Sequence, residues 1–152
     1  MIRVVFVCLG NICRSPMAEV VFRDMVRRAG LEEKISVRSR ATEPYEEGDG
    51  IYPPAEKELQ RHGLSAAGHR SVMLKEGEKN DADFFLCMDR ANLRDCARIL
   101  KTNEKQYLLT SFTGRYEEVA DPWYTGDFAG VYRQIKEGCE AFLDYLRRWK
   151  RI

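Results

Sequence analysis

The stretch Cys8-Leu9-Gly10-Asn11-Ile12-Cys13-Arg14-Ser15 places a thiol and a guanidinium with five residues between them, at a junction between two kinds of local structure. Residues 3–7 before it form a short apolar, β-branched run that is typical of a buried strand. Ser15-Pro16 is typical of a helix start, with a hydroxyl N-cap and then proline. Backbone N–H groups that converge at such a junction bind tetrahedral anions, and phosphate is the obvious candidate.

Two side chains in this stretch have the chemistry for phosphoryl transfer. Cys8 is the candidate nucleophile, because the field that attracts phosphate also favours a thiolate over a thiol. Arg14 has a planar fork that binds two phosphate oxygens at once. Ser15 is expected to cap the helix while its hydroxyl reaches back toward Cys8. The predicted phosphate-binding residues are Leu9, Gly10, Asn11, Ile12, Cys13 and Arg14.

Gly10 and Asn11 make the phosphate interpretation stronger than a chance cysteine–arginine spacing. Glycine lets the backbone approach a ligand, and asparagine tolerates a left-handed conformation better than most residues. An alternative makes Cys8 a buried strand residue and Arg14 a solvated charge, but it leaves Gly10-Asn11 and Ser15-Pro16 unexplained.

Residues 7–16 resemble the signature of the low-molecular-weight protein tyrosine phosphatases, Val-Cys-x-Gly-Asn-x-Cys-Arg-Ser-Pro. The likeness continues through residues 17–19, 87–89, 92–94 and 121–124, in family order, so it spans essentially the whole chain. The resemblance implies hydrolysis of phosphotyrosine in protein substrates, and of small aryl phosphates, through a cysteinyl phosphate. Inorganic phosphate would be the product, with no metal and no cofactor.

Length and composition fit one phosphatase domain over residues 1–152, since 44% hydrophobic residues can build a core on both faces of a small sheet. The 25 basic and 24 acidic residues nearly cancel, so no overall field gathers nucleic acid or a membrane surface. No apolar run reaches the length of a signal peptide or a membrane span. The five cysteines lack the spacings of a zinc site or a disulfide scaffold. We therefore expect a cytoplasmic protein.

Helix and strand signals alternate along the chain, which indicates a parallel sheet covered by helices. We expect strands at 3–8, 35–40, 83–88 and 107–110. We expect helices at 16–29, 53–63 and 90–100, a loop at 111–129, and a last helix whose apolar face runs from Val131 to Trp149. This pattern predicts a three-layer, single-domain α/β fold, and the resemblance implies the strand order 2-1-3-4.

Ligands in open parallel sheets bind beyond the carboxyl ends of the strands, where Cys8, residues 39–45, Asp89 and residues 121–124 would meet. Asp121 is the candidate general acid and base, because neighbouring aromatic rings could exclude water and keep its proton available. The resemblance assigns this aspartate the same role. An Asp-Pro pair also commonly does no more than start a turn.

Aromatic residues are expected to set the choice of substrate. Tyr45, Trp123 and Tyr124 would form walls beside Ile12 that favour the flat ring of phosphotyrosine. A related branch that dephosphorylates arginine has threonine where this chain has Ile12, which favours an aryl substrate but leaves a phosphoarginine phosphatase as an alternative. Glu46 stands where the family more usually has histidine, which leaves the details of the wall open.

By resemblance, Asn11, Ser15, Ser39 and His69 form hydrogen bonds that hold the loop in shape, and Ser15 eases departure of the thiolate. His62 is expected to be a structural residue at a helix end.

Two further features concern regulation. Cys13 lies in the same loop as Cys8, so a reversible disulfide could trap oxidised Cys8. Tyr124 is a candidate phosphorylation site.

Three other functions are alternatives to a phosphatase. A thiol-dependent arsenate reductase would need Cys87 and Cys96 as a relay, but their spacing is wide for that purpose. A non-catalytic phosphate-binding module would not need nucleophile, arginine, hydroxyl and acid together. A cysteine protease is the poorest match, because neither histidine has an evident orienting partner.

Overall fold

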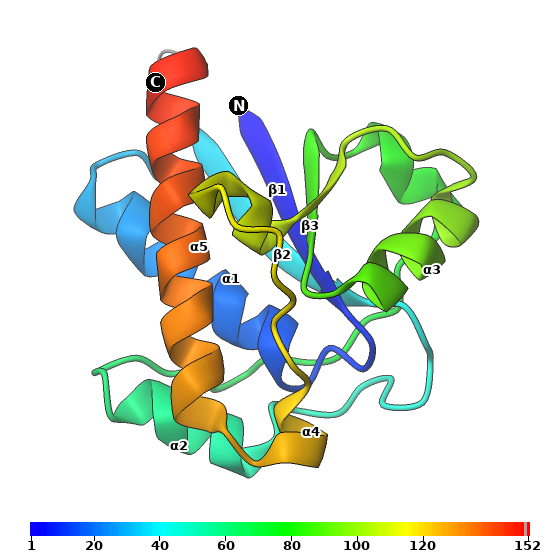
Figure 1. The fold of residues 1–152 in the computed structure, drawn as a ribbon, viewed down its shortest axis with the longest axis vertical. Coiled ribbons are helices and arrows are strands. Elements are labelled where there is room, and N and C mark those ends of the chain that lie inside the picture. Colours follow the sequence, from blue (N-terminus) through cyan, green and yellow to red (C-terminus); the bar gives the residue numbers. More distant parts are fainter. Residues whose placement is uncertain (151) are drawn as a thin grey trace.

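Four parallel strands form the centre of the fold, and helices cover both faces (Figure 1). The structure, a computed structural model, describes residues 1–150 and 152. The strands are β1 (Ile2–Cys8), β2 (Ile35–Ala41), β3 (Phe84–Cys87) and β4 (Gln106–Leu108). Their order, β2-β1-β3-β4, confirms the predicted single-domain α/β fold.

The helices lie in two layers around this sheet. Helices α1 (Arg14–Arg28), α2 (Pro53–Gln60) and α5 (Phe128–Trp149) pack together on one side, and α3 (Arg90–Leu100) lies on the other (Figure 1). The remaining elements are the short helix α4 (Pro122–Thr125) and two 3₁₀ helices, η1 (Glu76–Asn80) and η2 (Leu109–Thr113).

The helix predicted at 90–100 is confirmed as α3, but the prediction was wrong in part for the chain after it. The predicted strand 107–110 ends at Leu108, because the Ser111 hydroxyl donates to the Leu108 carbonyl (2.7 Å) and the chain turns into η2. The predicted loop 111–129 contains the end of η2, all of α4 and the start of α5.

The predicted start of α1 was also wrong. The helix begins at Arg14 with Cys13 at the N-cap position, and no side chain caps it. Ser15 therefore lies in the first turn, where its hydroxyl contacts the Cys8 sulfur at 3.0 Å instead of a backbone amide. Pro16 fits this turn because the first N–H groups of a helix have no intrahelical partner.

The alternation of side chains along β1 separates two hydrophobic cores. Phe6 and Cys8 face the core beneath α1 and α5, whereas Val7 faces the smaller core beneath α3. Cys87 and Cys96 belong to the second core. The sheet thus lies between Cys8 and these two thiols, which disfavours the disulfide relay of an arsenate reductase.

The buried face of α5 is shorter than predicted. Its residues from Val131 to Leu146 pack in the core at helical spacing, but Trp149 is 67% exposed. Within residues 1–150 and 152, no helix has the length and apolar character needed to span a membrane.

A close contact between α5 and η2 yields a stability test. A Cβ atom on Gly138 would lie 2.7 Å from Leu109 Cγ in the core. We expect Gly138→Ala to lower the free energy of unfolding by about 1–3 kcal/mol, because overpacking outweighs the better helix propensity of alanine. Urea denaturation followed by circular dichroism measures the change.

Gly77→Ala in η1 is the matched control, since nothing lies within 4 Å of its added Cβ. If the two variants differed in stability by less than about 0.5 kcal/mol, the packing argument would be wrong.

Candidate active site

The 8–15 loop joins the carboxyl end of β1 to the first turn of α1. The segment after β2 holds its first half, where Thr42 N donates to the Cys8 carbonyl (3.0 Å) and Glu43 N to the Leu9 carbonyl (3.1 Å). Tyr52 N donates to the Ile12 carbonyl (2.8 Å). Asn11 has the left-handed conformation that its residue type tolerates, with φ of 58°. The loop therefore curls back over the end of β1.

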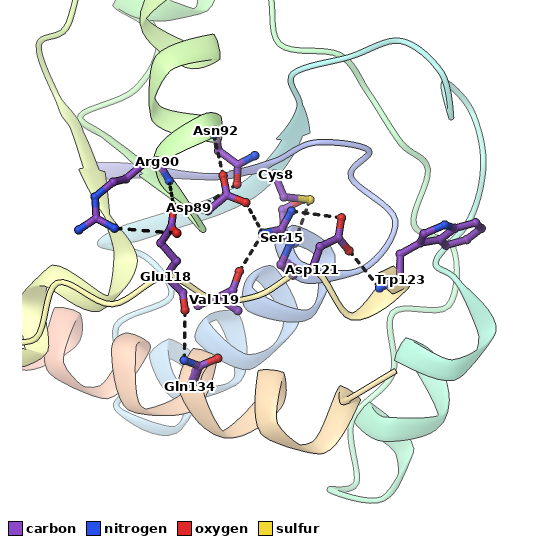
Figure 2. A network of polar contacts seen from close by, with 11 residues as sticks. Cys8, Ser15, Asp89, Arg90, Asn92, Glu118, Val119, Asp121, Trp123 and Gln134 are labelled. Carbon is purple, nitrogen blue, oxygen red and sulfur yellow. Dashed lines mark hydrogen bonds and ion pairs between the residues drawn. The ribbon is translucent and has the colours of Figure 1, made fainter. Parts of the chain in front are cut away.

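The Cys8 sulfur lies buried inside this curl, beside Ser15 (Figure 2). Its Sγ is 3.0 Å from Ser15 Oγ and 3.4 Å from Ser15 N, which belongs to the first turn of α1. Asn11 Nδ2 donates to Ser15 Oγ (2.7 Å), so the hydroxyl proton of Ser15 remains available to the sulfur. These contacts place two hydrogen-bond donors of Ser15 beside the sulfur.

Asn11 connects the loop to three other parts of the chain. Its Nδ2 also donates to Ser39 Oγ (2.9 Å), and its Oδ1 accepts from Val72 N (3.1 Å). His69 Nε2 lies 2.7 Å from the Asn11 carbonyl oxygen. The structure thus places Ser39 and His69 in contact with Asn11.

Arg14 is held by acceptors on its outer side. Its Nη1 donates to Asp89 Oδ2 (2.7 Å) and to the Val119 carbonyl (2.9 Å), and its Nη2 lies 3.5 Å from Asp121 Oδ2. Burial opposes the charge, but the Cys8 sulfur and the Asp89 and Asp121 carboxylates outweigh burial and raise the pKa of Arg14. Arg14 is therefore a fixed cation beside the sulfur.

Asp121 both starts a helix and faces the site. Its Oδ1 accepts from Trp123 N (3.0 Å) as the N-cap of α4, which Pro122 opens. The other carboxylate oxygen, Oδ2, is the one near Arg14. Asp121 therefore starts a turn, as an Asp-Pro pair commonly does, and also faces the site.

A pocket of about 220 Å³ brings most of the predicted site residues together, although Asn11 and Ser15 do not line it. Its lining is Cys8, Leu9, Gly10, Ile12, Cys13, Arg14, Tyr45, Glu46, Asp121, Trp123 and Tyr124. Tyr45 and Tyr124 are the most exposed of the aromatic walls, at 78% and 79%. Trp123 is steadied by the Tyr52 ring, whose centre is 4.7 Å away. A larger groove of about 800 Å³ beside α1 and α5 contains none of these side chains.

Glu46 is a wall residue to which the sequence assigned no role. A Cβ on Gly10 would lie 3.4 Å from Glu46 Cγ, so the Glu46 side chain packs over the loop. The neighbouring Asp49 carboxylate, which can accept a hydrogen bond from protonated Glu46, raises the pKa of Glu46, with a smaller contribution from burial. The pocket mouth therefore has a carboxyl group at the position where related proteins were expected to have a histidine.

Other contacts of the loop were also missed. Sequence placed Asp89 at this edge of the sheet, but not as the partner of Arg14, which is 75 positions away. The Ser71 hydroxyl donates to the Gly10 carbonyl (2.8 Å), and no pattern in the sequence marks that contact.

Cys13 and His62 differ from the reactive groups of the site. Burial, with a smaller effect of Cys8, raises the pKa of Cys13 to about 12, so Cys13 is a thiol at neutral pH. His62 stacks on Tyr132, with ring centres 3.7 Å apart, and Nε2 contacts Glu58, outside the pocket. In the described residues, 1–150 and 152, no group of three or more His, Cys, Asp or Glu side chains could hold a metal ion.

Known proteins resemble this chain over its full length. The family model described as low molecular weight phosphotyrosine protein phosphatase matches residues 3–151. Low molecular weight protein-tyrosine-phosphatase YfkJ of Bacillus subtilis is 38% identical over 156 residues, which covers 100% of both chains. The low molecular weight phosphotyrosine protein phosphatase of Sus scrofa is 36% identical and covers 95% of both chains.

Solved structures agree with these sequence relatives. The crystal structure of YfkJ from Bacillus subtilis has a TM-score of 0.94 at 36% identity, over 99% of this chain and 97% of that chain. The Drosophila arginine phosphatase structure has a TM-score of 0.88 at 31% identity, over 95% and 97%. The chain belongs to the low-molecular-weight protein tyrosine phosphatase family of phosphoric ester hydrolases.

Proposed function

We propose that this protein hydrolyses phosphotyrosine in protein substrates, and small aryl phosphates, through a phosphoryl group carried on Cys8. The observation that carries the proposal is the convergence of three groups on one pocket: the Cys8 sulfur, the Arg14 guanidinium and the Asp121 carboxylate. A nucleophile, an anion clamp and an acid are the groups that phosphoryl transfer to a side chain requires.

In the first step, the loop N–H groups and Arg14 bind the equatorial phosphate oxygens. The Cys8 thiolate attacks phosphorus, the phosphorus–oxygen bond to the phenol breaks, and Asp121 donates its proton to the departing oxygen. The products of this step are the free phenol and the cysteinyl phosphate.

In the second step, the Asp121 carboxylate takes a proton from water as the water oxygen attacks phosphorus. The phosphorus–sulfur bond breaks, inorganic phosphate forms, and the electron pair stays on sulfur. Ser15, whose Oγ lies 3.0 Å from Cys8 Sγ, donates to the departing thiolate. The second step returns Cys8 to the thiolate and Asp121 to the protonated carboxyl with which the first step began.

The walls favour an aryl ester. Tyr45, Trp123 and Tyr124 surround the opening, and a flat ring can lie between them while its phosphate reaches the loop. Ile12 adds an apolar contact and offers no hydrogen bond to a guanidinium. The Drosophila arginine phosphatase shares the fold, so fold alone does not discriminate between the two substrates.

Hydrolysis of p-nitrophenyl phosphate tests the catalytic assignment. We expect Cys8→Ser to abolish turnover, and Asp121→Asn to lower kcat by about 10²–10⁴-fold because the leaving oxygen loses its proton donor. Cys96→Ala, in the core beneath α3, is the matched control and should retain activity. Turnover by Cys8→Ser would contradict the mechanism, and arsenate-dependent thiol oxidation that requires Cys96 would establish the reductase instead.

Peptides that carry phosphotyrosine, phosphoserine or phosphoarginine test the substrate class. We expect the highest kcat/KM for phosphotyrosine, because only its ring spans the walls. Steady-state release of inorganic phosphate measures the three rates. A preference for phosphoarginine would show that the pocket walls have been misinterpreted.

We also propose that peroxide inactivates the enzyme reversibly. Peroxide would oxidise the Cys8 thiolate to a sulfenic acid, and Cys13 would displace water to form a disulfide. All five cysteines are free in the structure, which is consistent with a reducing compartment such as the cytoplasm. Mass spectrometry should find Cys8 linked to Cys13 after limited peroxide, and overoxidised Cys8 in Cys13→Ser. Overoxidised Cys8 beside a free Cys13 in the parent protein would refute this proposal.

A further inference from the structure

Glu19 lies on α1, outside the pocket, but it contacts Ser39, the first residue in a series of hydrogen bonds that reaches the Cys8 sulfur. Glu19 Oε1 accepts from Ser39 Oγ at 2.5 Å, and its other oxygen pairs with Arg23 Nη2 at 2.5 Å. Arg23 also donates to the Val37 carbonyl (2.7 Å), which ties it to β2. The Glu19 side chain is 16% exposed, so its carboxylate is largely shielded and held from two sides.

The chemistry of a carboxylate fixes the direction of the first hydrogen bond. An ionised carboxylate only accepts, so the Ser39 proton points toward Glu19. The Ser39 oxygen then offers only lone pairs to Asn11, whose Nδ2 donates to it at 2.9 Å. Ser39 is 3% exposed, which leaves little water to replace either partner.

The hydrogen-bond direction that begins at Glu19 continues through Asn11 and Ser15 to the Cys8 sulfur. Asn11 Nδ2 donates its second proton to Ser15 Oγ (2.7 Å), and the Ser15 proton is left to face Cys8 Sγ (3.0 Å). If the Asn11 amide were reversed, its oxygen would face both hydroxyls and draw the Ser15 proton away from sulfur. With Glu19 present, that reversed state places the Asn11 oxygen against a Ser39 oxygen that has no proton to give.

We propose that Glu19 is a positioning residue that acts through Ser39 and Asn11, so that the Ser15 hydroxyl donates to the Cys8 sulfur. This inference rests on the proposed function for its effect on turnover. Its effect on the sulfur itself does not depend on any substrate. Val72 N, which donates to Asn11 Oδ1, supports the same orientation from the backbone.

The test compares Glu19→Gln with the parent protein in two assays. A glutamine amide can donate to Ser39, which allows the reversed direction. We expect kcat for p-nitrophenyl phosphate to fall by about ten-fold, the loss typical of one hydrogen bond to a charged group, while KM changes little. The pH at which iodoacetate inactivation reaches half its maximal rate should rise, because sulfur loses a donor.

Ser39→Ala removes the same link from its other end and provides an independent variant. It should shift the inactivation profile in the same direction, and Glu19→Gln in the Ser39→Ala background should add nothing. Asp24→Asn is the control, because that carboxylate lies on the same helix but pairs with Arg27 and Arg28. Circular dichroism confirms that each variant is folded. The other ionisable groups near the sulfur are unchanged in every variant, and they include Cys13, Arg14, Glu46, Cys87 and Asp121.

Two outcomes would overturn the inference. One is a parent-like inactivation profile in folded Glu19→Gln, and the other is full additivity of the Glu19 and Ser39 substitutions. If the parent itself failed to hydrolyse p-nitrophenyl phosphate, the proposed function would fail, but the iodoacetate profile would still decide the role of Glu19.

Discussion

The function that we propose depends on holding negative charge on the Cys8 sulfur in the place where a phosphate dianion must also bind. The 8–15 loop curls so that the backbone N–H of Ser15, in the first turn of α1, points to the Cys8 sulfur, and the N-terminal end of a helix is a favourable place for negative charge. Asn11 enforces the curl with a left-handed backbone and with hydrogen bonds to three other segments. The sheet contributes by placing Cys8 at the carboxyl end of a central strand, where the chain is free to turn.

The elements around the pocket supply acceptors that balance the positive charge of Arg14. Arg14 faces Asp89, Asp121 and the Val119 carbonyl, so its guanidinium is fixed before any phosphate arrives. Fixed donors need no reorganisation while the phosphoryl group moves from the ester oxygen to sulfur, as the proposed mechanism requires. Cys13, the other thiol of the loop, stays protonated because burial disfavours its charge. Of the two thiols of the loop, Cys8 is therefore the one that we propose as nucleophile.

The fold and the chemical groups of the site could be predicted from the sequence, because the signals for both lie in residues that are neighbours along the chain. The alternation of apolar runs and punctuation predicted the parallel sheet, and Cys8, Arg14 and Asp121 could be chosen from residue type and position. What sequence could not provide were contacts between distant segments, such as Asp89 with Arg14 or Ser39 with Glu19. Ser15 was misplaced as a cap since its residue type suits both a helix start and the sulfur, and only the folded loop decides between them.

The most direct test is to trap the covalent intermediate. The protein is mixed rapidly with p-nitrophenyl phosphate, quenched in acid and digested, and the peptide that contains Cys8 is analysed by mass spectrometry. The account predicts that this peptide gains the mass of one phosphoryl group, located on Cys8. Steady turnover with the phosphoryl group found on another residue, or on none at any quench time, would contradict it.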